Sequence, residues 1–338
     1  MTIPLYKSMR AGLYVLIVAS AFFSAFFAVP WSVRAESRAT PLLVVASTAM
    51  ISQPASRLFG DTAHVVTLMK EGTDPHLYRP TRADMVALAR ADVVLWTGAD
   101  LEANLRRPID SLVAERQLVL TLMDFVPPAQ RLSVRGSSAD PHIWMDPLLW
   151  RSVFAQAVSV LEERFPKQAA NYRQRWQDIA DDWQNLHTAI ETMTSSLPAS
   201  QRVLITAHDA FSYFGRRYNI GVEGIQGIST ESEAGLRRMR SLIDMIIAKR
   251  IPAIFSEASV SPRHVLSLLE GVQARGIALQ LGGVLYGDSM GHPHSIEGTY
   301  EGMMRHNAAT IVRALSKPAQ DVAAHSDSRV RSPSDSHP

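Results

Sequence analysis

The sequence predicts an α/β fold of two lobes, each a parallel sheet flanked by helices, joined by one long rigid helix. Short runs rich in Val, Ile and Leu recur in both halves of the chain, with helical patterns between them. Such runs are typical of strands buried on both faces, and their alternation with helices indicates parallel order. No Gly or Pro interrupts residues 167–197, where apolar side chains recur at alternating spacings of three and four, so we predict an amphipathic helix there.

Capping signals predict where several helices begin. Thr81 is followed three residues later by an acid, and Asp146 is followed by a proline, which suits the first helical position. The stretch 229–233 is predicted to open another helix, because its acids suit the positive helix end. The predicted strands are 41–47, 64–68, 92–97 and 118–122 in the first half, and 202–207, 221–228, 253–256 and 277–281 in the second.

The N-terminus has the features of a secretory signal peptide. Two basic residues, Lys7 and Arg10, precede an apolar run, and residues 33–35 form a small-x-small cleavage pattern. The alternative is an uncleaved membrane anchor, because the run is near the lower limit for crossing a bilayer. We expect a signal peptide at 1–35, a first lobe at 36–163, the linking helix at 164–198, a second lobe at 199–316 and a disordered tail at 317–338.

Composition excludes several classes of function. The 338 residues include 34 Lys and Arg against 32 Asp and Glu, so there is no basic excess that would favour nucleic acid as a partner. Cysteine is absent, which excludes disulfides, thiolate metal sites, a cysteine nucleophile and a lipid-bearing cysteine. We therefore expect a protein that is soluble in the periplasm after cleavage, without nucleic acid or a membrane anchor.

Four polar residues are candidates for a metal site. His76 and His142 each follow Asp-Pro, and a proline before the imidazole stiffens the loop that would hold it. His208 ends a predicted strand, where side chains reach the ligand crevice of an open parallel sheet. Asp288 lies shortly beyond another predicted strand. Three imidazoles and a carboxylate suit a divalent ion, although these residues lie far apart and widely spaced histidines are usually structural or exposed.

A second motif overlaps the first and predicts different chemistry. Residues 287–291 fit the G-x-S-x-G nucleophile elbow, with Ser289 as nucleophile of a hydrolase. Its acid and base would be Glu297 or Glu301 with His306, or residues of the tail, but no Gly-rich oxyanion loop precedes the motif. His292 and His294 are interpreted as exposed loop residues.

Seven ordered stretches resemble the substrate-binding proteins of zinc/manganese-type ABC transporters, the cluster A-I metal-binding lipoprotein-like family. The resemblance runs from about residue 42 to 315 and implies two α/β lobes with one metal ion between them. Position by position, it implies His76, His142, His208 and Asp288 as ligands. The stretches are GTDPHLYRPTRAD at 72–84, DPHIWMDP at 140–147, TAHDAFSYFGRRY at 206–218, GIQGISTESEAG at 224–235, FSEASVSP at 255–262, LYGDSMG at 285–291 and EGTYEGMMRHN at 297–307.

The resemblance implies a non-enzymatic monomer that captures a divalent metal ion and delivers it to an ABC permease. Residues 126–139 contain no histidine, unlike the His-rich loop of many zinc-selective members, and this favours manganese, with zinc or iron as alternatives. Against manganese, many manganese members have Glu where this chain has His208. A zinc-selective member, a serine or metal-dependent hydrolase and an adhesin of the same fold are the alternatives. Binding should weaken below about pH 6.5, because the imidazoles must be neutral to ligate.

Overall fold

The structure is a computed structural model that describes residues 40–112, 117–133, 139–316 and 320–321. The elements below belong to the unit Pro41–Pro338. The predicted signal peptide lies outside the described residues. So does the predicted tail, except for Gln320 and Asp321, which form a short strand. No helix in the described part of the chain is both long and apolar enough to cross a membrane.

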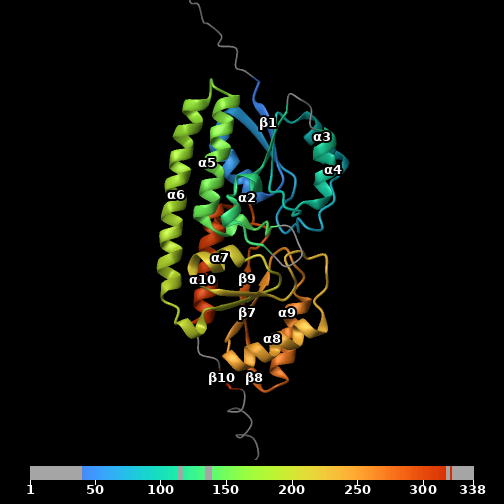
Figure 1. The fold of residues 1–338 in the computed structure, drawn as a ribbon, viewed down its shortest axis with the longest axis vertical. Helices are drawn as coiled ribbons and strands as arrows, with labels where there is room; N and C mark the ends of the chain where they lie inside the picture. The colour runs from blue at the N-terminus through green and yellow to red at the C-terminus, as the bar shows by residue number, and fades with distance from the viewer. Residues whose placement is uncertain (1–39, 113–116, 134–138, 317–319, 322–338) are drawn as a thin grey trace, which may run out of the picture. The chain divides into compact units, whose positions relative to one another are not determined.

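The first lobe, which includes β1 in Figure 1, contains a four-stranded parallel sheet in the order β2-β1-β3-β4. All four strands predicted for this half are confirmed. Alternate residues of β1 point to opposite faces: Val44 and Ala46 join the core beneath α2 and α5, whereas Val45 packs toward α3 and α4. The elements are β1 (Leu42–Ala46), α2 (Ala49–Phe59), β2 (Ala63–Thr67), α3 (Arg82–Arg90), β3 (Val93–Trp96), α4 (Ala103–Leu112), β4 (Leu118–Thr121) and α5 (Pro147–Arg164).

The second lobe contains two short parallel pairs, β5 with β6 and β7 with β9, and β5 lies beside β7. A further pair, β8 with β10, is antiparallel. Helices surround these strands. The elements are β5 (Val203–Thr206), α7 (Ser212–Tyr218), β6 (Gly221–Gly224), α8 (Leu236–Lys249), β7 (Ala253–Glu257), α9 (Arg263–Gln273), β8 (Ile277–Ala278), β9 (Gln280–Leu285), α10 (Tyr300–Leu315) and β10 (Gln320–Asp321).

The strand predicted at 277–281 is wrong in its extent. It is two strands, and the second, β9, continues to Leu285. The sequence obscured this because Gly282 and Gly283 suggest a turn. In the structure Gly283 has φ +142°, and a Cβ on Gly282 would lie 2.5 Å from the Phe255 ring, so glycine allows close packing here. The register between β7 and β9 shifts at the same place.

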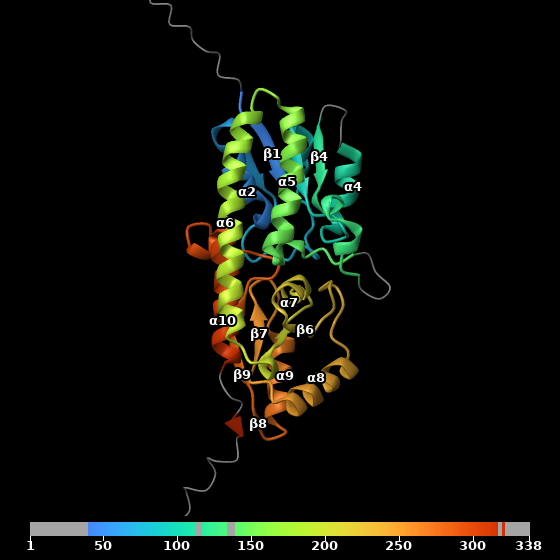
Figure 2. The ribbon, with the colours of Figure 1, turned by 60° about the vertical axis from the view of Figure 1, so that its left-hand side comes forward.

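The linking element is α6 (Ala169–Ser195), 27 residues and therefore about 40 Å long. It packs against α2 and α5 of the first lobe and against α7 and α10 of the second (Figure 2). Trp183 and Ile190 are among the fully buried residues of its apolar stripe. A single helix that contacts both lobes limits how far they can move relative to each other. This agrees with the predicted two-lobe α/β fold.

Two of the three predicted helix starts are confirmed. Thr81 and Asp84 form a reciprocal capping box at the start of α3, and Asp146 accepts hydrogen bonds from the first backbone N–H groups of α5. The third is wrong, because α8 begins at Leu236 and residues 229–235 precede it as a loop. The short 3-10 helices are η1 (Gly60–Thr62), η2 (Leu122–Phe125), η3 (Pro128–Gln130), η4 (Ile143–Met145), η5 (Ala199–Gln201) and η6 (Ile296–Gly298).

Candidate metal centre

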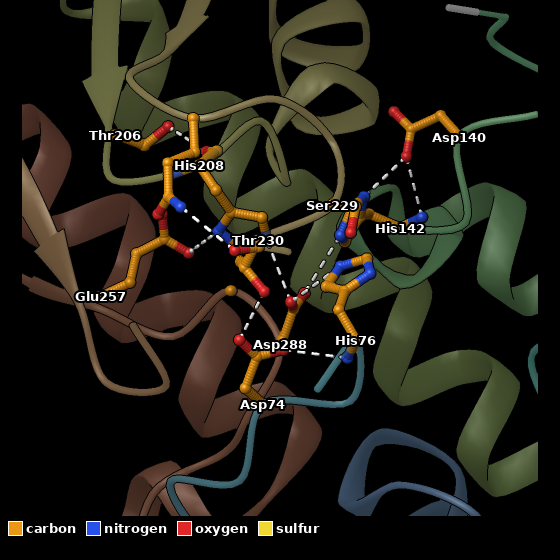
Figure 3. Close-up of polar contacts among 12 residues, drawn as sticks. Asp74, His76, Asp140, His142, Thr206, His208, Ser229, Thr230, Glu257 and Asp288 are labelled. Carbon is orange, nitrogen blue, oxygen red and sulfur yellow. Dashed lines mark hydrogen bonds and ion pairs between the residues drawn. The ribbon is translucent and has the colours of Figure 1, made fainter. Parts of the chain in front are cut away.

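The four residues predicted for a metal site meet between the two lobes (Figure 3). His76 follows β2 and His142 precedes η4, so both come from the first lobe. His208 lies two residues after β5, and Asp288 lies three residues after β9 in the second lobe. All four side chains are buried, and one potential ligand atom from each lies within 4.8 Å of the others. Side chains from distant parts of the chain thus form one polar cluster.

The Asp288 carboxylate lies at the centre of the cluster. Its Oδ2 is 3.0 Å from His208 Nε2 and 3.4 Å from His76 Nε2, and its Oδ1 is 3.2 Å from His142 Nε2. Ligands bound to one zinc ion at about 2.1 Å in a tetrahedron lie about 3.4 Å apart. The separations therefore match those of atoms that share one ion.

Six buried side-chain atoms of the four residues lack a hydrogen-bond partner among the described residues. One is His208 Nδ1, on the side of the ring near Glu257. The other five face one another at the centre of the cluster: the Nε2 atoms of the three histidines and both carboxylate oxygens of Asp288. Buried polar atoms are nearly always paired, because burial removes their hydrogen bonds to water. A divalent cation would satisfy all five at once, since neutral imidazole nitrogens and a carboxylate are suitable donors for it.

The His142 ring is oriented by its own Asp-Pro-His loop. Asp140 Oδ1 accepts the backbone N–H of His142 at 3.0 Å and lies 2.7 Å from its ring Nδ1. The backbone bond is the one that the loop pattern predicted. The ring bond places a hydrogen on Nδ1 and leaves Nε2 free to face Asp288. Carboxylates in this position fix the tautomer and orientation of histidine ligands.

The His208 ring is oriented by Glu257, the last residue of β7. One carboxylate oxygen, Oε1, accepts the backbone N–H of His208 at 2.9 Å, and Oε2 lies 2.9 Å from the ring Nδ1. Glu257 was not identified from the sequence. The only signal was an acid at the end of a buried strand run. Gly287 passes so close that a Cβ there would lie 2.1 Å from Glu257 Oε2.

Asp74 supports His76 in a different way. Its Oδ1 accepts the backbone N–H of His76 at 2.9 Å, as the loop pattern predicted. Its Oδ2 accepts the hydroxyl hydrogen of Thr230 from the second lobe at 2.6 Å. Thr230, too, was not identified as a site residue from the sequence.

Electrostatics in the metal-free cluster favour charged groups. Burial by itself would lower the pKa of His142, but Asp288 and Asp140 outweigh it and raise that pKa to about 9. Burial would likewise lower the pKa of His208, but Glu257 and Asp288 outweigh it and raise that pKa well above its ordinary value. Burial would raise the pKa of Asp288, but the two histidines hold it well below its usual range. A bound cation must therefore displace protons.

The residues proposed for a serine nucleophile are not arranged for catalysis. The buried Ser289 Oγ has no hydrogen-bond partner among the described residues, so no base is in place to activate it. His306 instead contacts a backbone carbonyl of β9 at 3.0 Å and lies 3.8 Å from Glu297. Glu301 pairs with Arg57 at 2.6 Å.

His292 and His294 lie outside the four-residue cluster. Both are exposed, as predicted, and the backbone N–H of His294 donates to Nδ1 of His292 at 3.2 Å. This bond leaves the hydrogen of a neutral His292 ring on Nε2, which disfavours that nitrogen as a ligand.

Comparison with known proteins gives consistent results along most of the chain. Residues 44–314 match the family model described as "Zinc-uptake complex component A periplasmic". The zinc-binding protein TroA of Treponema pallidum is 39% identical over 275 residues, which are 81% of this chain and 89% of that protein. The manganese-binding lipoprotein MntA of Bacillus subtilis is 34% identical, over 91% of this chain and 100% of that protein.

More distant relatives and solved structures agree. The iron-binding protein YfeA of Yersinia pestis is 29% identical over 80% of this chain and 86% of that protein. The structure of the periplasmic zinc-binding protein TroA from Treponema pallidum superposes with a TM-score of 0.79 at 38% identity, and the match covers 81% of this chain and 99% of that one.

Proposed function

This chain belongs to the family of periplasmic zinc-uptake component A proteins, and from that premise we propose that it captures one divalent transition metal ion for import. The ligands we propose are His76, His142, His208 and Asp288. The observation that supports this most strongly is the group of five buried, unpartnered atoms that face one another between the lobes. The proteins of this family are binding components of transporters, not enzymes.

The cargo we propose is manganese in the cell, with zinc binding readily in vitro. The stretches at 224–235 and 255–262 resemble manganese or mixed manganese, zinc and iron members, and the absence of histidine from residues 126–139 is unlike many zinc-selective members. The donor set supports tight zinc binding, because intrinsic affinity for three imidazoles and a carboxylate rises from manganese through iron to the later metals. Relatives of this chain are named for zinc, manganese and iron, so the family includes proteins for each of these metals.

The route we propose ends at a membrane permease. The chain would be exported, lose residues 1–35 and hold its ion as a soluble periplasmic monomer until it docks on an ABC transporter. The cluster favours this role because both lobes supply ligands. A small movement of one lobe relative to the other would then weaken binding at the permease.

Elemental analysis of protein purified from its native compartment tests the cargo. We expect one manganese ion per chain, and a zinc-replete, manganese-free protein would favour the zinc-selective alternative. Calorimetry on the metal-free protein tests capture itself. It should give one high-affinity site per chain, and no high-affinity site for any divalent ion would refute the proposal.

A further inference from the structure

The two Asp-Pro-His loops contact the second lobe in different ways. In both, the aspartate accepts the backbone N–H of its own histidine, at 2.9 Å for Asp74 and 3.0 Å for Asp140. Asp140 uses the same oxygen to orient the His142 ring. Asp74 instead uses its second oxygen to accept the Thr230 hydroxyl of the opposite lobe. The repeated motif therefore has one intralobe and one interlobe version.

The loop that carries His142 is joined to the second lobe by several buried bonds. Trp144 Nε1 donates to the carbonyl of Gly287, beside Asp288, at 3.0 Å. Tyr300 donates its hydroxyl to the carbonyl of Trp144 at 2.7 Å, and Tyr213 donates to the carbonyl of Asp140 at 3.1 Å. These bonds fix the His142 loop against the second lobe whether or not an ion is present.

The loop that carries His76 has far less support from the second lobe. Among the described residues, the Thr230–Asp74 bond is the only hydrogen bond from residues 72–78 to that lobe. The His76 ring itself faces Asp288 at 3.4 Å, the longest of the three histidine contacts with that carboxylate. Leu77, next to His76, is 54% exposed, so apolar packing does not compensate.

Thr230 is itself held in place by the second lobe. Gln226 donates through its side-chain amide to the carbonyls of Thr230 at 3.2 Å and Ser232 at 3.0 Å. The backbone N–H of Gln226 donates to the carbonyl of Ala207, the residue before His208, at 2.9 Å. Thr230 is only 8% exposed. A series of bonds thus runs from Ala207, beside His208, through Gln226 and Thr230 to Asp74 and His76. Figure 3 shows Thr230, Asp74 and His76 of this series.

We propose that the Thr230 hydroxyl is an interlobe latch that positions His76 and thereby sets how fast the metal ion leaves. The bond joins a hydroxyl to an aspartate that also holds the His76 backbone, so losing it frees the least supported ligand of the four. Thr230 is a positioning residue, not a ligand. The inference rests on the proposed metal-binding function.

Metal release from the chain without residues 1–35 tests the latch. Wild type, Thr230→Val, Thr230→Ser and Ser229→Ala are loaded with zinc, and release is followed after mixing with excess chelator. Valine keeps the shape of threonine but has no hydroxyl, and we expect it to speed dissociation about tenfold, as for loss of a hydrogen bond to a charged group. Serine keeps the hydroxyl and should stay near wild type. Ser229→Ala is the matched control, because the Ser229 hydroxyl bonds within its own loop.

Three further readouts separate a latch from a general structural effect. The association rate of Thr230→Val should match wild type, and the melting temperature of its metal-free form should fall no further than that of Asp74→Ala, which loses the same bond. In an Asp74→Ala background, Thr230→Val should have no further effect, because the partner is already gone. Equal dissociation rates for Thr230→Val and wild type, an equally fast Ser229→Ala or an undiminished effect without Asp74 would overturn the latch alone. Wild type that binds no zinc would overturn the proposed function and the latch with it.

Discussion

Replacing Glu257 with glutamine should weaken metal binding without touching a ligand. Glu257 Oε1 accepts the backbone N–H of His208 at 2.9 Å, and Glu257 Oε2 lies 2.9 Å from the ring Nδ1 of His208. Glutamine has the same shape but only one oxygen. If that oxygen keeps the backbone N–H, the amide NH₂ faces Nδ1 and forces the ring hydrogen onto Nε2. A protonated Nε2 cannot bind a metal ion.

The expected size follows from the role of such partners. Loss of a carboxylate that orients a histidine ligand typically costs 10–100-fold in metal affinity, which is about 1.4–2.7 kcal/mol. We expect the loss of metal affinity in Glu257→Gln to fall in this range. Because a changed tautomer is the cause, most of this loss should remain at high pH.

Competition titrations with a zinc chelator measure this change against a matched control. Glu102 is another buried carboxylate, but it accepts hydrogen bonds from Ser47 and from backbone N–H groups at residues 97 and 98, away from the four candidate ligands. Glu102→Gln should change the melting temperature and leave zinc affinity within about twofold, as expected for a residue outside the site. Wild-type affinity in Glu257→Gln would refute the reasoning that His208 needs this partner.

Four further predictions concern the whole chain. Because the pKa of His142 is raised to about 9 in the metal-free protein, metal affinity should begin to fall at about pH 9 and not only below pH 6.5. The fall should be about tenfold per pH unit for each proton displaced, which metal titrations across this range check. The raised pKa of His142 stabilises the metal-free protein fully below pH 6.5, and this stabilisation is lost as pH rises through 9. The melting temperature of the metal-free protein should therefore fall across that window, and a rise would contradict the raised pKa of His142. Metal at about 100 times Kd should add about 2.7 kcal/mol to the free energy of unfolding, and calorimetry with and without chelator checks this. N-terminal sequencing of exported protein should begin at Glu36.

The sequence predicted the sheets and the long helix because their signals are local. Continuous Val, Ile and Leu runs need no information from elsewhere in the chain, and the stripe that includes Trp183 and Ile190 is set by helical spacing alone. The error of extent at 277–281 has a tertiary cause. Gly282 fits inside β9 only because the Phe255 ring lies against it, and neither residue reveals this by itself.

Part of the site could be predicted for a similar reason. The Asp-Pro-His pattern fixes a local turn, so the aspartate bonds to the backbone of His76 and His142 were predictable. Glu257 and Thr230 act across β-strands and across lobes, and no sequence spacing encodes those distances. The stretch around Thr230 suggested a helix start, but it is a loop whose threonine bonds to the other lobe.

Metal content of two neighbouring variants tests the central claim most directly. Asp288→Ala removes the carboxylate that contacts all three histidines, whereas Ser289→Ala removes a buried hydroxyl beside it. After identical zinc loading and desalting, we expect one ion per chain in wild type, nearly the same in Ser289→Ala, and little or none in Asp288→Ala. Ester hydrolysis measured on the same samples should be absent throughout. A metal-replete Asp288→Ala protein, or ester hydrolysis lost in Ser289→Ala, would contradict the account.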